Sequence, residues 1–145
     1  MKAIIIGGGS IGKRHSQNLK DLNVLTRIVD IDEIDNIDNI LEEGFDMGLV
    51  CSPNVKHIEH CLKLAQYSIP IFCEKPFYSS NEGLDELLTL IKEKNLTTMV
   101  GCNLRFTDEL QSINPSSKYI SLVIFLLPRV KGSAYLCTYY CYYCL

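Results

Sequence analysis

A glycine-rich turn between an apolar strand and a helix is the feature that most constrains the fold of this chain. Residues 2–6 are apolar apart from Lys2, and residues 7–12 follow the pattern G-x-G-x-x-G. Gly7 permits a tight turn off the strand, Gly9 lets the backbone approach a phosphate closely, and Gly12 lets the helix pack on the sheet. The pattern predicts a dinucleotide site in which a pyrophosphate meets the first N–H groups of the helix, at Ser10 and Ile11.

An acidic residue follows the second predicted strand at the spacing that such sites use. Asp30 lies 18 residues after Gly12, and the carboxylate that binds the ribose hydroxyls is expected roughly 20 residues on. This carboxylate would repel a 2′-phosphate, and the next residues, Ile31 and Asp32, provide no arginine to receive one. We therefore predict NAD as the cofactor in preference to NADP.

Short apolar segments alternate with helical ones as far as residue 103. Because each apolar segment is bounded by turn residues, the pattern is typical of parallel strands buried on both faces. It predicts an α/β fold, a Rossmann-type doubly wound parallel sheet. Apolar periodicity places Leu22 and Leu88 towards the sheet, and a serine or asparagine is expected to cap the fourth helix. Strands are predicted at 2–6, 24–30, 47–51, 69–73 and 97–102, and helices at 10–22, 33–43, 55–66 and 80–94.

Polar side chains follow the third predicted strand, at the edge of the sheet where ligands bind. Ser52 and Asn54 lie there, and His57 follows in the next helix. Ser52 and Asn54 are candidates for binding ribose or phosphate groups of the cofactor, for capping the helix, or for both roles. His57 is a candidate for the site, whereas His15 and His60 are interpreted as packing or surface residues.

The segment Glu74-Lys75-Pro76 follows the fourth predicted strand, and Arg105 follows the fifth. Lys75 can donate to a substrate hydroxyl, or its pKa can fall if it is desolvated. The alternative for Glu74 and Lys75 is a surface salt bridge at a strand end. Arg105 is a candidate for holding a polar or anionic substrate group, or it pairs with a neighbouring carboxylate.

Four segments, in this order and spacing, resemble the N-terminal half of the glucose-fructose oxidoreductase, inositol dehydrogenase and rhizopine-catabolism (Gfo/Idh/MocA) family. They are residues 7–15, Ser-Pro-Asn-x-x-His at 52–57, Glu-Lys-Pro at 74–76 and Gly-Cys-Asn-Leu-Arg-Phe at 101–106. The resemblance covers residues 1–112. It implies hydride transfer between NAD(P) and a CH–OH group of a sugar, polyol or sugar derivative.

The resemblance also implies roles for individual residues. Lys75 would lie near the nicotinamide and the substrate and assist proton transfer. Asp30 would bind the adenosine ribose, and Glu74 and His57 would contribute to the cofactor site. The Lys75–Pro76 bond would be cis, an isomer found almost only before proline.

The composition changes sharply after residue 109. All 17 acidic residues lie at or before Glu109, and the last 11 residues contain five tyrosines and three cysteines. We predict an NAD(P)-binding domain at 1–112 and an atypical, poorly ordered tail at 113–145. We interpret the tail as the product of a truncated or frameshifted reading frame that lacks the family's C-terminal substrate domain, so that the chain alone is inactive. The alternative is a short, non-catalytic module that only binds nucleotide.

The tail carries one motif of its own. Cys137, Cys141 and Cys144 have the spacing that ligates a four-iron cluster in radical S-adenosylmethionine enzymes. Only one residue follows the motif, so we favour an exposed, oxidation-prone segment and expect no metal site.

Charge and hydropathy exclude some classes of partner. The net charge of −3 gives no basic surface for nucleic acid. The apolar run 119–127 is shorter than the roughly 20 residues of a membrane helix, so no membrane partner is expected. No leader pattern is recognised, which favours the cytoplasm. The expected partners are the dinucleotide and, with a substrate domain, a small sugar-like molecule; an oligomer is compatible with the sequence.

Overall fold

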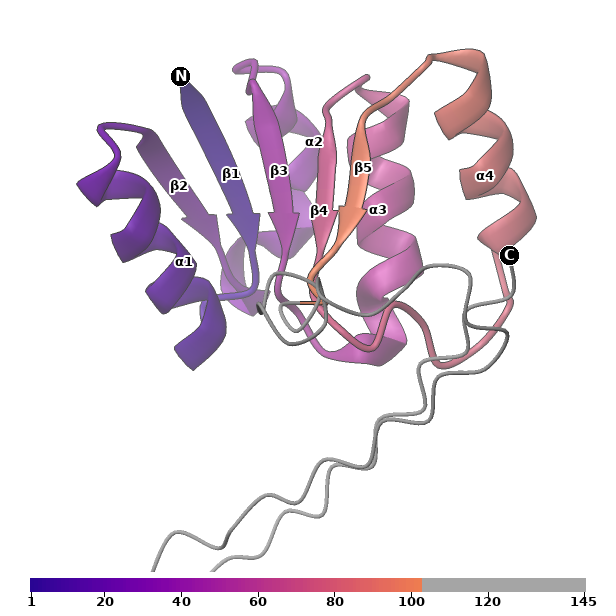
Figure 1. Ribbon diagram of the computed structural model, residues 1–145, viewed down its shortest axis with the longest axis horizontal. Helices are drawn as coiled ribbons and strands as arrows, with labels where there is room; N and C mark the ends of the chain where they lie inside the picture. Colours follow the sequence, from indigo (N-terminus) through magenta and orange to yellow (C-terminus); the bar gives the residue numbers. More distant parts are fainter. Residues whose placement is uncertain (103–145) are drawn as a thin grey trace, which may run out of the picture. The chain divides into compact units, whose positions relative to one another are not determined.

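The computed structural model describes residues 1–102, which form a five-stranded sheet with helices on both faces (Figure 1). The sheet order is β2-β1-β3-β4-β5, and every neighbouring pair is parallel. The strands are β1 (Lys2–Ile6), β2 (Leu25–Val29), β3 (Met47–Val50), β4 (Ile71–Cys73) and β5 (Thr98–Val100). The helices are α1 (Ser10–Asp21), α2 (Ile37–Leu41), α3 (His57–Gln66) and α4 (Leu84–Glu93), with 3-10 helices η1 (Ile31–Asn36) and η2 (Asn54–Lys56).

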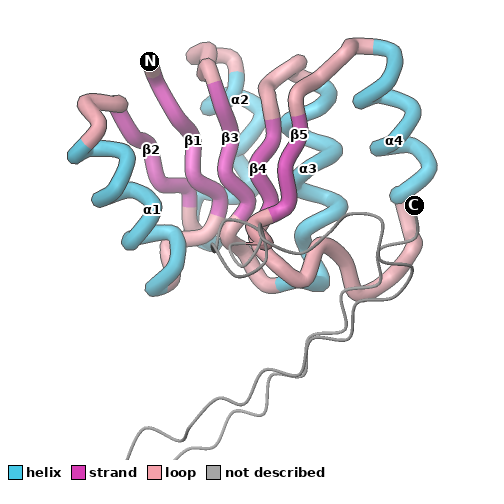
Figure 2. The backbone as a smooth tube through the Cα atoms, viewed as in Figure 1, coloured by secondary structure: helices cyan, strands magenta, loops and turns pink. Residues whose placement is uncertain are grey.

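The order of the strands creates a crevice at one edge of the sheet. The chain passes from β1 to β2 on one side, then crosses back to β3 on the other side of β1. All strands end at the same edge, the lower one in Figure 2. In open parallel sheets, ligands bind beyond the carboxyl ends of the strands, where the chain order changes direction. That position lies here between the ends of β1 and β3.

Alternate residues of the strands face two separate apolar layers. Ile4, Ile6 and Val50 pack with α2, α3 and α4 on one face, whereas Ala3 and Ile5 face the side of α1. The predicted doubly wound Rossmann-type sheet is therefore confirmed. Within residues 1–102, no helix combines the length and the hydropathy that crossing a membrane requires.

Two leucines that we expected to face the sheet lie in solvent instead. Leu22 is 73% exposed because α1 ends at Asp21 and Leu22 is its C-terminal cap. Leu88 is 43% exposed, whereas the preceding Leu87 is completely buried. Successive residues of a helix are turned by about 100°, so Leu88 lies at the side of α4 when Leu87 points directly at the core.

Two predicted helices differ from the observed ones in their first turns. The segment predicted as one helix at 33–43 is the 3-10 helix η1 followed by the short α2. Aspartate and asparagine are frequent there, and their side chains compete for backbone hydrogen bonds. The helix predicted from residue 80 begins only at Leu84, and its cap is Gly83, with φ +76° and no side-chain hydrogen bond. The expected serine or asparagine cap is wrong.

Several predictions fall outside the described residues. They are the role of Arg105, the domain boundary at 112 and every statement on residues 113–145. These stay predictions, and the site below is built from residues 1–102 alone.

Replacing Gly48 by alanine is expected to destabilise the fold. A Cβ at this position in β3 would lie 2.5 Å from Cδ1 of Leu64, a buried residue of α3. Overpacking of this kind costs about 1–3 kcal/mol, so chemical denaturation should show a lower free energy of unfolding for Gly48→Ala. The penalty should shrink in a Leu64→Ala background, where the added methyl group has room. Equal penalties in the two backgrounds would contradict this account of β3–α3 packing.

Candidate dinucleotide site

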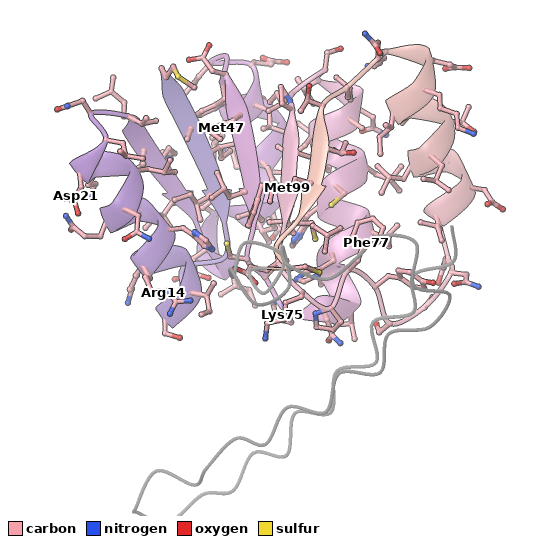
Figure 3. The ribbon with its side chains drawn as sticks, viewed as in Figure 1. Arg14, Asp21, Met47, Lys75, Phe77 and Met99 are labelled. Atoms are coloured by element: carbon pink, nitrogen blue, oxygen red, sulfur yellow. The ribbon has the colours of Figure 1, made fainter. Side chains whose placement is uncertain are left out.

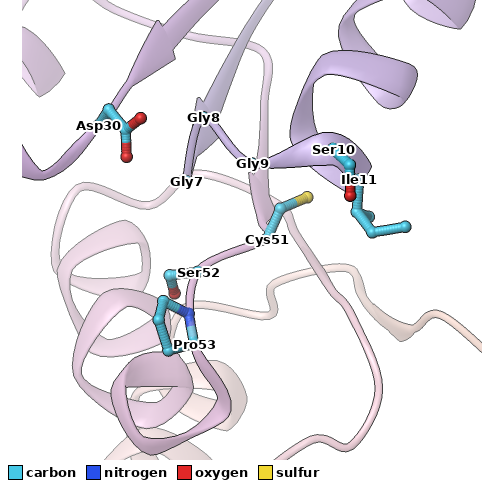
Figure 4. A pocket seen from close by; sticks show the side chains of 9 residues that line it. All are labelled: Gly7, Gly8, Gly9, Ser10, Ile11, Asp30, Cys51, Ser52 and Pro53. Atoms are coloured by element: carbon cyan, nitrogen blue, oxygen red, sulfur yellow. The ribbon is translucent and has the colours of Figure 1, made fainter. Parts of the chain in front are cut away.

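A cleft of about 490 Å³ opens at the carboxyl edge of the sheet (Figure 4). This volume falls in the range of roughly 300–1,000 Å³ typical of small-molecule sites. Its walls come from the ends of three neighbouring strands and the start of α1. The lining residues are Gly7, Gly8, Gly9, Ser10, Ile11, Asp30, Cys51, Ser52 and Pro53.

The three glycines of the motif face different surroundings. Gly7 has φ +111°, and a Cβ there would lie 2.6 Å from backbone atoms of Cys51 and Ser52. A Cβ on Gly12 would collide with the carbonyl oxygen of Gly7, so α1 approaches β1 as closely as its backbone allows. A Cβ on Gly9 would meet no atom within 4 Å. Gly7 and Gly12 are thus required by the fold itself, whereas Gly9 leaves open space for a ligand.

The start of α1 presents uncompensated positive charge to the cleft. Its N-cap, Gly9, makes no side-chain hydrogen bond, and its first turn contains no acidic residue. Each of the other α-helices in residues 1–102 carries an acid in its first turn. Because the first N–H groups of a helix lack intrahelical partners, they suit an anion such as a pyrophosphate.

Asp30 marks the end of the cleft at β2. Its side chain is exposed, and Oδ1 accepts a hydrogen bond of 3.0 Å from the backbone N–H of Ile31. A Cβ on the buried Gly8 would lie 2.9 Å from Cγ of Asp30, so the carboxylate stands directly against the glycine turn. The nearby Arg27 is held by Glu33, with Nη2 donating to Oε1 at 2.7 Å. The wall at Asp30 is therefore acidic.

Two histidines of α3 hold the loop after β3. Oγ of Ser52 lies 2.8 Å from Nδ1 of His60, and Nε2 of His57 lies 2.8 Å from the carbonyl oxygen of Ser52. Neither η2 nor α3 has a side-chain cap hydrogen bond. The interpretation of Ser52 and Asn54 as helix caps is therefore wrong.

The segment Glu74-Lys75-Pro76 is anchored to α1. Oε1 of Glu74 lies 2.7 Å from Nε2 of His15, and Oε2 accepts from the backbone N–H of Lys75 at 3.2 Å. His15 also packs edge-on against Phe72. The Lys75–Pro76 bond is cis, as the resemblance implied. Lys75 is exposed and lies at the edge where the strands end (Figure 3).

The cysteines near the cleft are neutral thiols. Burial, followed by the charge of Glu74, raises the pKa of Cys51 to about 12. The contact with Cys61 and burial raise the pKa of Cys73 above its ordinary range. All four cysteines of residues 1–102 are free, and no group of three or more His, Cys, Asp or Glu side chains in that part of the chain is placed to hold a metal ion.

The structure brings only part of the expected site into the cleft. The expected site residues that do line the cleft are Gly7, Gly9, Ser10, Ile11, Asp30 and Ser52. The expected site residues placed outside the lining are Gly12, Asn54, His57, Glu74 and Lys75. Sequence reasoning missed Gly8, Cys51 and Pro53, although each adjoins an expected residue and the same strand-end argument could have included it.

A parallel sheet, a glycine turn at a helix N-terminus and a strand-end acid define a dinucleotide-binding α/β domain. The model of the Gfo/Idh/MocA oxidoreductase family, NAD-binding Rossmann fold, matches residues 23–102, more than half of the chain. This chain belongs to that family.

Two curated relatives and one solved structure that resemble this chain are named as oxidoreductases or dehydrogenases. An uncharacterised oxidoreductase, YrbE, of Bacillus subtilis is 30% identical in an alignment 127 residues long, which covers 75% of this chain and 37% of the relative. The myo-inositol 2-dehydrogenase of Thermotoga maritima is 27% identical over 73% of this chain and 37% of its own length. A crystal structure of a probable dehydrogenase from Thermotoga maritima superposes with TM-score 0.60 and 26% identity, over 73% of this chain and 37% of the other. The chain thus spans little more than a third of these relatives.

Gly9 and Gly12 should respond differently to the same substitution. Gly9→Ala adds a methyl group to open space, so the melting temperature should stay close to that of the wild type while NADH affinity falls at least tenfold. Gly12→Ala pushes α1 off the turn and should lower the melting temperature by several degrees, as expected for a loss of about 1–3 kcal/mol. Thermal denaturation and NADH fluorescence titration check both variants. A Gly9→Ala variant that binds NADH normally would contradict the placement of the phosphates at this residue.

Proposed function

We propose that this chain provides the NAD-binding part of a dehydrogenase that oxidises a CH–OH group of a sugar, polyol or sugar derivative. The observation that carries the proposal is the cleft in which the open side of Gly9, the start of α1 and Asp30 meet. Family membership and the similarity to a myo-inositol 2-dehydrogenase support the reaction class and the kind of substrate.

The residues of the cleft fit a dinucleotide that is bound in one orientation. The N–H groups at Ser10 and Ile11 would hold the pyrophosphate, because that helix end has no acid or side-chain cap of its own. The Asp30 carboxylate would accept hydrogen bonds from the adenosine ribose. Ser52 and Asn54 would contact the remaining ribose or phosphate groups from the loop after β3. When bound, the nicotinamide supplies the hydride chemistry, and the protein positions it.

Lys75 is the residue that we assign to proton transfer. It lies two residues after the end of β4 and is exposed at the edge where the cleft opens. As a neutral amine, the side chain at this point can accept the hydroxyl proton of the substrate while the CH–OH group becomes a carbonyl, and as an ammonium group it can return that proton in the reverse reaction. Glu74 and its partner His15 fix the backbone from which Lys75 projects.

A non-catalytic nucleotide-binding module is the second candidate, because Lys75, the residue that we assign to proton transfer, lies outside the lining of the cofactor cleft. NADH titration of the purified chain tests cofactor binding, which both candidates require. Turnover of inositols, sugars and sugar nucleotides with NAD, measured on the protein at its native length, separates them. Failure to bind NADH would refute both, and binding without turnover would leave the module.

NAD should be preferred over NADP. Asp30→Ala should lower NADH affinity about 10- to 100-fold, the equivalent of losing a charged hydrogen bond, and should lower NADPH affinity much less. Asp21→Ala removes the same charge from the other end of α1 and should leave both affinities unchanged (Figure 3). Fluorescence titration with each cofactor measures the ratio. Tighter binding of NADPH than of NADH by the wild type would contradict the assignment.

Lys75 should affect turnover more than cofactor binding. Lys75→Ala should lower kcat by a factor on the order of 10² or more if the side chain acts in proton transfer. The dissociation constant for NADH should change less than threefold, because Lys75 lies outside the cleft lining. Steady-state kinetics on the native-length protein and NADH titration provide the two values. Unchanged kcat would reduce Lys75 to a structural residue.

We also propose a reducing compartment, the cytoplasm, for this protein. Cys51, Cys61, Cys73 and Cys102 are all free thiols, and free thiols are usual where glutathione keeps cysteines reduced. The dinucleotide and a sugar-like substrate are the proposed partners.

A further inference from the structure

The ring of His57 lies between two backbone carbonyl groups. Its Nδ1 is 2.9 Å from the carbonyl oxygen of Pro76, and its Nε2 is 2.8 Å from that of Ser52. The residue is only 2% exposed. A neutral imidazole has one N–H, so its other nitrogen would turn a lone pair towards a carbonyl oxygen. Only the imidazolium form donates to both acceptors.

We propose that His57 is a buried imidazolium that clamps the loop after β3 to the Lys75–Pro76 turn, and that it is thereby a positioning residue for Lys75. The inference deepens the proposed function and depends on it for the role of Lys75. His57 itself touches neither the cleft nor any reacting atom, since both of its ring nitrogens are used by the backbone.

The clamp joins the loop that lines the cofactor cleft to the turn that carries Lys75. A dehydrogenase must keep these two segments at a fixed distance from each other. Ser52 lines the cofactor cleft, whereas Pro76 directly follows Lys75. The loops leave neighbouring strands, β3 and β4, which pair in parallel. A planar ring with two opposed N–H groups fixes the separation of its two acceptors. His57 therefore sets how far Lys75 stands from the cleft wall.

A second histidine holds the same segment from the opposite face of the sheet. His15, on α1, binds Glu74, the residue before Lys75. His57, on α3, binds Pro76, the residue after it. Lys75 is thus held between two anchored neighbours, and its side chain projects from a backbone with little freedom to shift.

The charge on His57 is tolerated because the groups that face it stay neutral. These are the Cys73 thiol at the end of β4 and the His60 imidazole one turn along α3. Burial lowers the pKa of His60, which keeps that ring uncharged at neutral pH. Burial also opposes the charge on His57, whereas the carbonyl oxygens of Ser52 and Pro76 accept hydrogen bonds from its two ring nitrogens and raise its pKa.

Nitrogen-15 NMR of the imidazole rings tests the charge state directly. The chain has three histidines, so His57→Gln and His60→Gln variants assign every signal. Both ring nitrogens of His57 should carry protons at pH 7.5, whereas His60 should be neutral. A His57 ring with one unprotonated nitrogen at pH 7.5 would overturn the proposal.

Hydrogen exchange tests the clamp. In His57→Gln, backbone amides of residues 73–79 should exchange at least tenfold faster, while those of residues 7–12 should not change. His60→Gln is the matched control, because it removes another buried histidine of α3, one that hydrogen-bonds the hydroxyl of Ser52 and not a carbonyl group of the Lys75–Pro76 turn. Equal protection of residues 73–79 in the wild type and both variants would overturn the clamp. If His57→Gln does not fold, the wild-type ring spectrum still decides the charge state.

Kinetics then separate positioning from general stability. In the native-length protein, His57→Gln should lower kcat at least tenfold with less than a threefold change in the dissociation constant for NADH, and His60→Gln should not reproduce this pattern. Parallel losses in both variants would reject positioning. Failure of the proposed function would appear instead as absent NADH binding or turnover in the wild type, with the ring spectrum and the exchange pattern of His57 unaffected.

Discussion

The contact between Gly12 of α1 and the carbonyl oxygen of Gly7 fixes the geometry on which the rest of the site depends. No side chain separates α1 from the glycine turn at this contact. The first N–H groups of α1 therefore lie close to the end of β1, and even a methyl group at position 12 would move them away. The same turn runs against the backbone of Cys51 and Ser52, so β1, β3 and α1 are joined at one point. A helix shifted outward would lose both the anion-binding end and its register with the loop after β3.

Positive and negative groups lie at opposite ends of the cleft. The start of α1 is positive and bears no acid of its own, whereas Asp30 closes the opposite wall. Behind the cleft, Glu74 is hydrogen-bonded to His15, and Cys51 and Cys73 stay protonated. The two thiols therefore add no charge to the site, and the two ends of the cleft decide where positive and negative groups of a ligand fit.

The sequence predicted the elements whose signals are local and repeated. All five strands were located within two residues at each end, because short apolar runs bounded by turns have few other interpretations. The glycine turn and Asp30 were found because their spacing is fixed by a mechanical requirement. The helix starts near Ile31 and Leu84 and the outward turn of Leu88 were missed, since these depend on competing local hydrogen bonds and tertiary packing. The partners of His15, His57 and His60 could not be predicted. Each contact depends on where a side chain points in the folded protein, and a pattern of apolar positions does not encode that direction.

The closeness of Gly8 to Asp30 bears on how cofactor preference can evolve in this chain. A Cβ at position 8 would collide with the Asp30 carboxylate, so a side chain larger than glycine fits there only if the exposed carboxylate turns away from its present position. Shortening residue 30 first removes the collision and opens position 8 to side chains, whereas the reverse order passes through a crowded intermediate. The two positions are epistatic, and lineages that exchange the acid are expected to accumulate change at the second glycine only afterwards.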